Sequence, residues 1–550
     1  MRLRKRLCAI SLASIMLFTT ACGGGSSNGS KDGQTINAAF DADPTTLDPQ
    51  KGSDIYGNDV IVNTFEPLLR LKDGKDGATE IEKAAASDYK VSEDGLTYTF
   101  TIRDGMKWDD GKPLTAKDFE YGIKRTADPK TGAESAFLLE PIKNFKAVNN
   151  AKTNTPLDQL GVKAIDDKTL EIKLEAPTEY FLRLVPFRVM LPQRQDIVEK
   201  FGDKYGSEAD CYIGCGPYKL TEWVHGSKLT LVKSDTYWNK DSIKNYQVDV
   251  KVINDPTAVM NAFENGEIDK CKTTKVEWIN KFDKDDTAEK HKVGLPSIDY
   301  LTINHKNKLL SNKKIRLAML LALDRKDFNK TLFSGANKEA EYWIPEAIDV
   351  EGENYRNSAG KPFDSLRSAN PDPKKLFIEG MKELGLGEDP SKVSIEFICV
   401  NNPQVKKNGE YIQQCYNKVL GINIKLEMME WPILASRVNK ADYQIGYLAW
   451  TADYNDPSAM LSLFKSDAGA VNTGWSNAEY DSLVTKGTRS KDAKSAIENY
   501  KKAEQILMDE AVIIPVMSAE ASFYNKKYLK GSMFNQFSTM GFQTQYIENK

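Results

Sequence analysis

The sequence predicts an α/β protein that is built from more than one domain. Short stretches with alternating apolar residues, typical of β-strands, are followed by stretches with helical spacing along most of the chain. The chain has 550 residues, of which 40% are hydrophobic, so it can bury large cores. Because this length is too great for one compact domain, we expect two or three.

The N-terminus has the composition of a secretory signal. A basic stretch, MRLRKRL, is followed by apolar and small residues from Leu7 to Ala21, which predicts a signal peptide over residues 1–21. Its apolar run is shorter than the roughly 20 residues of a membrane-spanning helix, and apolar runs elsewhere are shorter still. The mature chain is therefore expected to be soluble.

Cys22 follows small residues at the predicted cleavage site and begins a flexible segment, poor in large side chains, over residues 22–34. This predicts a bacterial lipoprotein in which the Cys22 thiol carries a lipid and the segment is a tether. The expected location is the extracellular face of the bacterial cytoplasmic membrane. Thr19 stands where such signals usually have leucine. The alternative is plain secretion, with Cys22 removed.

The charge balance argues against a nucleic-acid partner. Removing Arg2, Arg4, Lys5 and Arg6 with the signal peptide leaves 71 of the 75 basic residues, against 78 acidic ones. A mature chain with this acidic balance is not expected to bind nucleic acid.

Five cysteines remain in the mature chain outside Cys22. Since disulfides form outside the cytoplasm, we expect some to pair. The expected bridges are Cys211 to Cys215 and Cys399 to Cys415, which leaves Cys271 free, although spacing alone does not fix the pairing. A metal site is the alternative, but the only histidines are those at 225, 291 and 305, and none has ligand spacing to the cysteines. No metal or cofactor is expected.

The elements alternate in type from the tether onward. TINAAF predicts a first strand at residues 35–40. A strand at 97–102 has Tyr98 and its alternate neighbours on one face, and Thr115 is placed to cap the following helix. A strand at 169–174 is followed by a helix capped by Thr178.

The remaining chain repeats this alternation. Further strands are predicted at residues 228–234, 246–255, 300–307, 393–400, 422–430, 443–450 and 511–516. Helices are predicted at residues 256–269, 311–333, 373–385, 406–419 and 489–510. The helix at 311–333 would be capped by Ser311 or Asn312.

Catalytic signatures are missing or lie in the wrong context. GSSNG matches Gly-x-Ser-x-Gly but falls in the tether, with no strand before it and no helix after it. No Walker-type phosphate loop occurs. Acid pairs are too frequent among 78 acidic residues to support a glycosidase. We do not expect an enzyme.

Five blocks of sequence carry a resemblance to a known family. They are TYTFTIRDGMKWDDGKPLTAKDFEYGIKRTADP, GPYKLTEW, KIRLAMLLALDRKDF, LGINIKLEMMEW and YLAWTADYNDPSAML. In this order and spacing the chain resembles the family 5 extracellular solute-binding proteins, and most of all the oligopeptide-binding lipoproteins of peptide ABC importers. The resemblance runs from about Ile36 to the end.

This resemblance implies a two-lobed periplasmic-binding-protein fold with two crossing hinge segments and an extra inserted α+β domain. Lobe I would comprise residues 35–65, 182–297 and 520–550. The inserted domain would be residues 66–181, and lobe II residues 298–519. The chain would cross between the lobes near 297 and near 519.

The segment AWTADYNDPS contains the expected anchor for a ligand. A free peptide always presents an α-ammonium group, so a receptor for many peptides needs one fixed anion. In similar oligopeptide-binding proteins an aspartate after Trp-x-x binds that ammonium group, and Asp453 holds this position. Asp456 and Pro457 are interpreted as a structural turn.

Further ligand contacts are expected around Asp453 and across the cleft. Trp450 offers an aromatic wall, and backbone groups of neighbouring residues would pair with an extended peptide. The expected ligand-binding residues are Tyr447, Ala449, Trp450, Thr451, Asp453, Tyr454 and Asn455, with Ala42, Asp43 and Thr45 from the other lobe.

One departure from the family pattern concerns the ligand carboxylate. Relatives often have an arginine three residues before the tryptophan, where this chain has Tyr447. A neutral phenol does not neutralise a carboxylate. Either another cation, such as Lys406 or Lys407, reaches it, or the preferred peptides differ in length.

The predicted function is a lipid-anchored, monomeric receptor that captures peptides of mixed sequence by hinge closure and delivers them to a membrane permease driven by a separate ATPase. The alternative on the same scaffold is another solute: a dipeptide, a metal chelate, an oligosaccharide or a signalling peptide. From other classes, a surface hydrolase and a surface adhesion or chaperone protein are alternatives.

Overall fold

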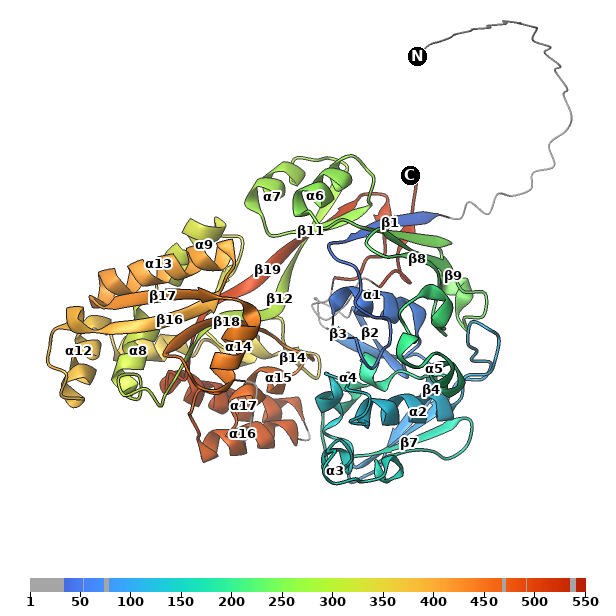
Figure 1. The fold of residues 1–550 in the computed structure, drawn as a ribbon, viewed down its shortest axis with the longest axis horizontal. Helices are drawn as coiled ribbons and strands as arrows, with labels where there is room; N and C mark the ends of the chain where they lie inside the picture. The colour runs from blue at the N-terminus through green and yellow to red at the C-terminus, as the bar shows by residue number, and fades with distance from the viewer. Residues whose placement is uncertain (1–33, 53, 74–78, 467–470, 491, 535–540) are drawn as a thin grey trace, which may run out of the picture.

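The computed structural model describes residues 34–52, 54–73, 79–466, 471–490, 492–534 and 541–550 (Figure 1). The predicted signal peptide, Cys22 and the predicted tether up to residue 33 lie outside these residues. Within them, no helix combines the length and the apolar character that crossing a bilayer requires. The chain forms two halves that stand side by side, joined by two long strands.

A mixed seven-stranded sheet forms the framework of one half, drawn on the left in Figure 1. Its order is β11-β19-β12-β18-β16-β17, with the short β13 also paired to β19. The strands are β11 (Lys270–Thr273), β12 (Ala288–Ile303), β13 (Lys338–Glu339), β16 (Ser394–Val400), β17 (Asn423–Met429), β18 (Ile445–Thr451) and β19 (Ile513–Lys526). β16 runs parallel to β17 and β18, whereas β12 pairs antiparallel with β18 and β19.

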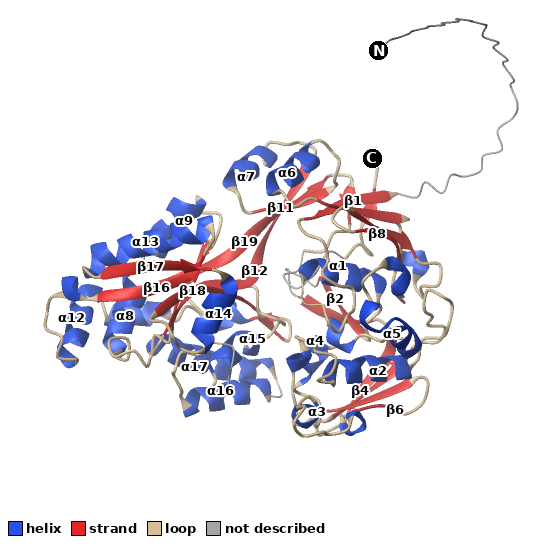
Figure 2. Ribbon diagram, in the orientation of Figure 1, coloured by secondary structure: helices blue, strands red, loops and turns tan. Residues whose placement is uncertain are grey.

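Helices cover both sides of this sheet (Figure 2). They are α8 (Lys313–Ala322), α9 (Arg325–Phe333), α10 (Tyr355–Ala359), α11 (Phe363–Ala369), α12 (Pro373–Glu383), α13 (Pro403–Leu420), α14 (Trp431–Asn439), α15 (Ser458–Leu461), α16 (Ala478–Thr488) and α17 (Ala493–Asp509). The predicted helices at 373–385 and 406–419 are confirmed as α12 and α13. The one predicted at 489–510 is confirmed as α17, which is capped by Asp492.

The single helix predicted at 311–333 is wrong. The structure has two helices there, because Leu323 leaves the helical conformation and the Asp324 side chain caps α9 by accepting the Asp327 N–H. Asn312, one of the two predicted caps, accepts from Lys314 N and Ile315 N at the start of α8.

A four-stranded sheet in the other half joins the start of the chain to a distant segment. Its order is β1-β10-β9-β8, and β1 runs parallel to β10. The strands are β1 (Thr35–Phe40), β8 (Tyr218–Val224), β9 (Lys228–Lys233) and β10 (Gln247–Val252). Phe542 and Ile547 of the C-terminal tail pack in the same core. The N-terminal strand and the tail therefore share a core, whereas the short tail pair β20 (Leu529–Lys530) and β21 (Tyr546–Ile547) is separate from the sheet.

A second four-stranded sheet, β4-β5-β7-β6, lies in the same half. Its strands are β4 (Ala86–Val91), β5 (Thr97–Ile102), β6 (Val162–Ala164) and β7 (Thr169–Lys173), and the hairpin β2 (Leu69–Asp73) and β3 (Thr79–Lys83) precedes it. The predicted strands at 97–102 and 169–174 are confirmed, with Tyr98, Phe100 and Ile102 buried. Thr115 and Asp118 form a capping box at the start of α2 (Ala116–Ala127), as the sequence indicated for Thr115.

The helix expected to start at Thr178 begins later and is short. The Thr178 hydroxyl donates to Ala176 O at 3.0 Å instead of capping a helix. α4 (Phe181–Leu184) follows Tyr180. α1 (Ile55–Thr64) and α5 (Gln195–Phe201) complete the main helices of this half, together with the 3-10 turn η4 (Arg188–Met190).

β12 and β19 connect the two halves. They pair antiparallel along most of their lengths, and their register shifts between Gly294 and Ile298 and again between Asp299 and Tyr300. α6 (Pro256–Glu264) and α7 (Val276–Phe282) pack beside them, where Phe263, Phe282 and Tyr524 form a small core. The predicted crossings near residues 297 and 519 fall in these two strands, and the predicted division into lobes stays a prediction.

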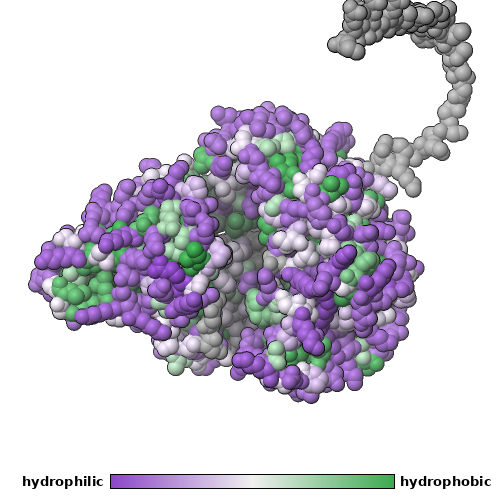
Figure 3. Space-filling view, viewed as in Figure 1, coloured by the Kyte–Doolittle hydropathy of each residue, from purple (hydrophilic) through white to green (hydrophobic). Residues whose placement is uncertain are grey.

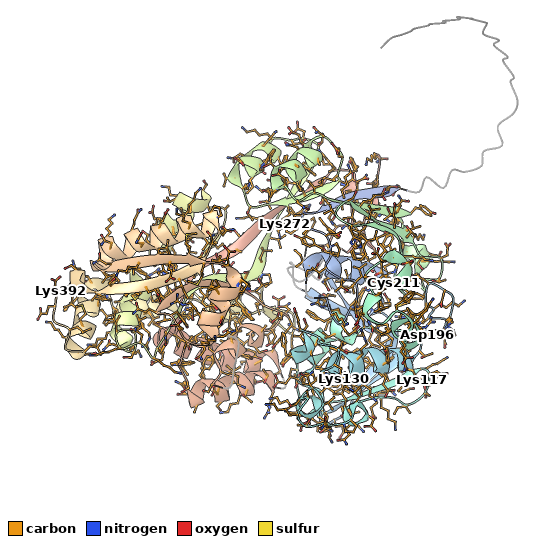
Figure 4. The ribbon with its side chains drawn as sticks, viewed as in Figure 1. Lys117, Lys130, Asp196, Cys211, Lys272 and Lys392 are labelled. Atoms are coloured by element: carbon orange, nitrogen blue, oxygen red, sulfur yellow. The ribbon has the colours of Figure 1, made fainter. Side chains whose placement is uncertain are left out.

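The predicted disulfides are wrong for the structure described. All five cysteines of the described residues are free. Cys211, inside the half on the right of Figure 4, donates to Lys204 O at 2.9 Å, and Cys215 accepts from Glu66 N at 3.4 Å. Cys415 lies on α13 and donates to Ala322 O at 3.3 Å, while Cys399 is buried in β16. The thiols of each predicted pair therefore have different surroundings.

Candidate functional site

The candidate site lies where β18 ends at the space between the two halves. Figure 3 shows a deep hollow between the halves. β18 leads into the loop of residues 452–457, and α15 follows next to α4 of the opposite half (Figure 1). The predicted ligand-binding residues from 447 to 455 are thus brought together at this boundary.

The second half of β18 has one unpaired edge. β12 pairs with β18 along its whole length, but β16 pairs only with Ile445 and Gly446. Among the described residues, no other strand pairs with Tyr447 to Thr451 on that edge. Ala449 and Thr451 are exposed. Their backbone groups are therefore available to an added strand, which is how many proteins bind extended peptides.

Asp453 is a half-buried carboxylate without a compensating partner. Burial raises its pKa to about 6. In the described part of the chain, its carboxylate accepts no hydrogen bond and forms no ion pair. A carboxylate removed from water in this way still ionises at neutral pH and is then stabilised by an incoming cation.

Trp450 lies at the end of β18 and is half-buried. Its indole N–H is buried and has no acceptor among the described residues. In the antiparallel register Trp450 is opposite Ile298, and part of its ring packs on the main core. The side chain therefore contributes to the core as well as to the wall beside Asp453.

Tyr447 does not face the ligand site with its side chain. The ring is buried, and its hydroxyl donates to Asp299 Oδ2 at 2.7 Å and accepts from Asn408 Nδ2 at 3.0 Å. Burial raises the pKa of Asp299 to about 6, and the bond from Tyr447 opposes that rise. Only the backbone of Tyr447 remains for the predicted pairing with a peptide.

Tyr454 and Asn455 have buried side chains with partners inside the protein, and their predicted contact with ligand stays a prediction. Tyr454 stacks on Tyr180 of the opposite half, with ring centroids 4.8 Å apart. Asn455 Oδ1 accepts from Asp349 N at 2.7 Å. Arg183, also from the opposite half, donates to the backbone oxygens of Asn455 and Asp349. Both residues therefore take part in the contact between the halves.

Asp456 forms the turn that the sequence indicated. Its carboxylate accepts from Ser458 N at 2.8 Å, from the Ser458 hydroxyl at 2.6 Å and from the Tyr500 hydroxyl at 2.9 Å. These three bonds fix the start of α15 and hold the loop that carries Asp453.

The segment of Ala42, Asp43 and Thr45 lies in the other half, just after β1. Asp43 is already occupied, since it accepts from Trp223 Nε1 at 3.0 Å and contacts His225 Nδ1 at 2.9 Å. Its hydrogen bond raises the pKa of His225. Thr45 Oγ1 donates to Asp54, which also caps α1. No hydrogen bond or ion pair between described residues joins this segment to β18 or its loop.

The two lysines proposed to meet a ligand carboxylate lie on the first turns of α13. Lys406 and Lys407 are exposed, and the Lys406 ammonium is 3.9 Å from Glu410. Neither contacts the Asp453 loop through a hydrogen bond. Among the described residues, no group of three or more acids, histidines or cysteines is arranged to hold a metal ion.

Sequence reasoning missed the arginines of α4 and η4. Arg183 and Arg188 interrupt the apolar run FLRLVPFRVML. Isolated cations in an otherwise buried stretch are costly unless they have a specific partner, and this is the sequence feature that could have drawn attention to them.

A sequence profile of the bacterial extracellular solute-binding proteins, family 5, matches residues 80–472. The chain belongs to this family. Its proteins bind solutes, so this chain is a binding protein and not an enzyme, and the expected two-lobed fold is confirmed.

Individual family 5 proteins resemble the chain over nearly its whole length. The oligopeptide-binding protein OppA of Bacillus subtilis is 32% identical over 99% of this chain and all of its own. The dipeptide-binding protein DppE of the same organism is 35% identical over 89% of this chain and 86% of its own. The crystal structure of the substrate-binding domain of an oligopeptide ABC transporter from Bacillus anthracis has a TM-score of 0.75 at 31% identity, covering 94% of this chain and 99% of that one.

Proposed function

We propose that this chain is the substrate-binding protein of an ABC importer and captures peptides between its two halves. The half-buried Asp453 carboxylate, with a pKa raised to about 6 and no cation beside it, carries the proposal. The α-ammonium group of a peptide supplies the missing positive charge. The similarity to peptide-binding family 5 proteins supports this class of solute.

The unpaired edge of β18 supplies the rest of the contact. An extended peptide anchored at Asp453 would run along Tyr447 to Thr451 and bond to their backbone groups. Backbone pairing does not depend on side chains, so the ligand would be peptides of mixed sequence. Peptide contacts to both halves would favour the closed form, because a ligand shifts the equilibrium towards the state that it binds better.

The remaining parts of the proposal concern topology and location. We assign residues 35–65, 182–297 and 520–550 to lobe I, residues 66–181 to an inserted domain and residues 298–519 to lobe II. A signal peptide over residues 1–21 and a lipid on Cys22 would keep the protein, as a monomer, on the outer face of the cytoplasmic membrane. There it would deliver peptide to a permease driven by an ATPase.

Calorimetry with an alanine peptide tests the role of Asp453. Asp453→Ala should weaken binding by about 30-fold or more, since loss of one member of a buried charge pair costs roughly 2 to 5 kcal/mol. N-acetylation of the peptide should weaken binding to the wild type and leave binding to the variant unchanged. Asp286→Ala, which removes an exposed acid elsewhere, is the control.

Equal affinity of the wild type for the free and the acetylated peptide would refute the role of Asp453. Mass spectrometry of ligand that purifies with the protein tests the solute class independently. Mixed peptides are expected, and a single sugar or metal chelate would contradict the proposal.

A further inference from the structure

A cavity of about 110 Å³ lies in the half that faces Asp453 across the hollow. It is formed between α1, β2 and η4, and α1, β2 and the neighbouring α4 border the space between the halves (Figure 1). Its apolar walls come from Val62, Phe65, Pro186, Phe187 and Leu191. Two arginines, Arg70 and Arg188, also line it. An apolar cavity with a few polar groups is the usual form of a subsite for part of a ligand.

The charge of Arg70 is neutralised within the protein. Its guanidinium donates to the carboxylate of Glu66, which is fully buried, and to the Tyr237 hydroxyl at 3.0 Å. Burial lowers the pKa of Arg70, but the Glu66 charge outweighs that effect and the pKa is raised overall. Arg70 is therefore part of an internal ion pair and needs no ligand.

Arg188 has no such counter-ion. Its guanidinium donates to the neutral hydroxyl of Ser135 at 3.2 Å, and no carboxylate of the described residues lies within ion-pair distance. Burial lowers the pKa of Arg188, and the more distant acids Asp54 and Glu134 only partly offset this. A partly dehydrated guanidinium without an anion is costly, and five fixed N–H donors make it well suited to a carboxylate.

We propose that this cavity is the subsite for a carboxylate of the bound peptide, which the Arg188 guanidinium holds. The proposal rests on the proposed function and adds what the sequence left open, namely the cation that meets the negative group of the ligand. Either the α-carboxylate of the peptide or an aspartate or glutamate side chain supplies the same chemistry. Asp453 and Arg188 would then hold opposite charges of one ligand from opposite halves.

Arg188 lies close along the chain to the contact between the halves. Tyr454, next to Asp453, stacks on Tyr180, and Arg188 follows Tyr180 after α4 and a short loop. One helical turn and four extended residues span at most ~20 Å, so the backbone of Arg188 lies within that distance of Tyr180. The length of peptide that reaches both charges is measured by the ligand series below.

The test measures affinities of alanine peptides, from the dipeptide to the octapeptide, for the wild type and variants. Arg188→Gln should weaken binding of the best free peptide by about tenfold or more. The affinity of Arg188→Lys should lie between those of the wild type and Arg188→Gln, because an ammonium group keeps the charge but loses the bidentate contact. Lys392→Gln removes a positive charge at the far end of the other half and should bind like the wild type (Figure 4).

A second set of ligands identifies the source of the carboxylate. If it is the α-carboxylate, amidation of the C-terminus weakens binding to the wild type and has no effect on Arg188→Gln. If it is a side chain, a glutamate in the amidated peptide strengthens binding to the wild type over the matching glutamine, again with no effect in the variant. Such coupling between a change in the ligand and a change in the protein would not arise from a damaged fold.

Two results would overturn the proposal. One is wild-type affinity of Arg188→Gln for all these peptides. The other is an equal loss for peptides with and without a carboxylate, which would make Arg188 a structural residue. If the wild type binds no peptide at all, the proposed function fails as well. If the wild type binds the peptides and prefers a free to an acetylated N-terminus, the proposed function stands and only the role of Arg188 fails.

Discussion

Asp453 is expected to make peptide affinity depend on pH. Burial raises its pKa to about 6, so the side chain is protonated below this value and ionised above it. Only the ionised form attracts an ammonium group. The dissociation constant should therefore rise about tenfold for each pH unit below about 6. Above pH ~8 affinity should fall again, because the α-amino group of the peptide loses its proton. Calorimetry across this range measures both the loss of affinity at low pH, the acidic limb, and the loss at high pH.

Two isosteric variants distinguish the contribution of Asp453 to this pH dependence from that of Asp299. Asp453→Asn should bind weakly at all pH values and lose the acidic limb. Asp299 also has a pKa raised by burial to about 6, but its carboxylate already accepts from Tyr447. Asp299→Asn should keep the acidic limb. A wild-type dissociation constant that stays level from pH 7 to about 5 would contradict the assignment to Asp453.

The residues of the site differ in how far the sequence could predict them. The role of Asp453 was predicted from its place in WTAD, by resemblance to oligopeptide-binding proteins, and from the chemistry that every free peptide shares, and it stays a prediction. Asn455 is another polar residue of the same segment, yet its side-chain amide oxygen accepts a hydrogen bond from Asp349 N, which is far away in the sequence. The role proposed for Arg188 depends on its having no acid within ion-pair distance among the described residues, which only the folded structure shows. Such pairings depend on packing between distant segments, which spacing along the sequence does not contain.

At the scale of elements, the boundary between α8 and α9 offers a test of local stability. Asp324 accepts the Asp327 N–H at 2.9 Å and caps α9. Asp324→Ala should lower the free energy of unfolding by about 1 kcal/mol, since it leaves a helix N–H without its acceptor. Urea denaturation followed by circular dichroism measures the change. Asp286→Ala, which removes an exposed aspartate without a capping role, should stay within about 0.5 kcal/mol of the wild type; an equal loss in both would contradict the capping role.

The alternation of apolar and polar residues predicted strands well wherever one face of a strand is buried. Tyr98, Phe100 and Ile102 show this in β5, since each second side chain enters the core. β12 was predicted to start at residue 300 but begins at Ala288. Its first part, AEKHKVGLPS, has no apolar alternation and contains a glycine and a proline. This part is a strand because it is hydrogen-bonded to β19. Its partner residues are far away in the sequence, so no local pattern predicts the pairing.

At the scale of the whole molecule, the two halves touch below the hollow as well as through β12 and β19. α4 and the residues before it supply one side of this contact, and the loop after β18, Asp349 and the end of α16 supply the other. Tyr180 stacks on Tyr454, and Glu179 N donates to Thr488 O at 3.3 Å. Because the loop after β18 also carries Asp453, ligand binding and the contact between halves involve the same short segment.

Arg183 provides the charged part of this contact and is the best place to test its effect on closure. Its guanidinium donates to Asp349 O at 3.0 Å and to Asn455 O. Bonds from a charged donor contribute roughly 1.5 to 3 kcal/mol. Arg183→Ala should therefore shift the ligand-free protein towards forms with the halves further apart, by about tenfold to a hundredfold in population.

Small-angle X-ray scattering of Arg183→Ala should record a larger radius of gyration than that of the wild type, and saturating peptide should restore the wild-type value. Lys130→Ala, which changes an exposed residue of the same half (Figure 4), should leave the radius unchanged. Identical scattering of Arg183→Ala and wild type without peptide would mean that β12 and β19 alone set the separation of the halves.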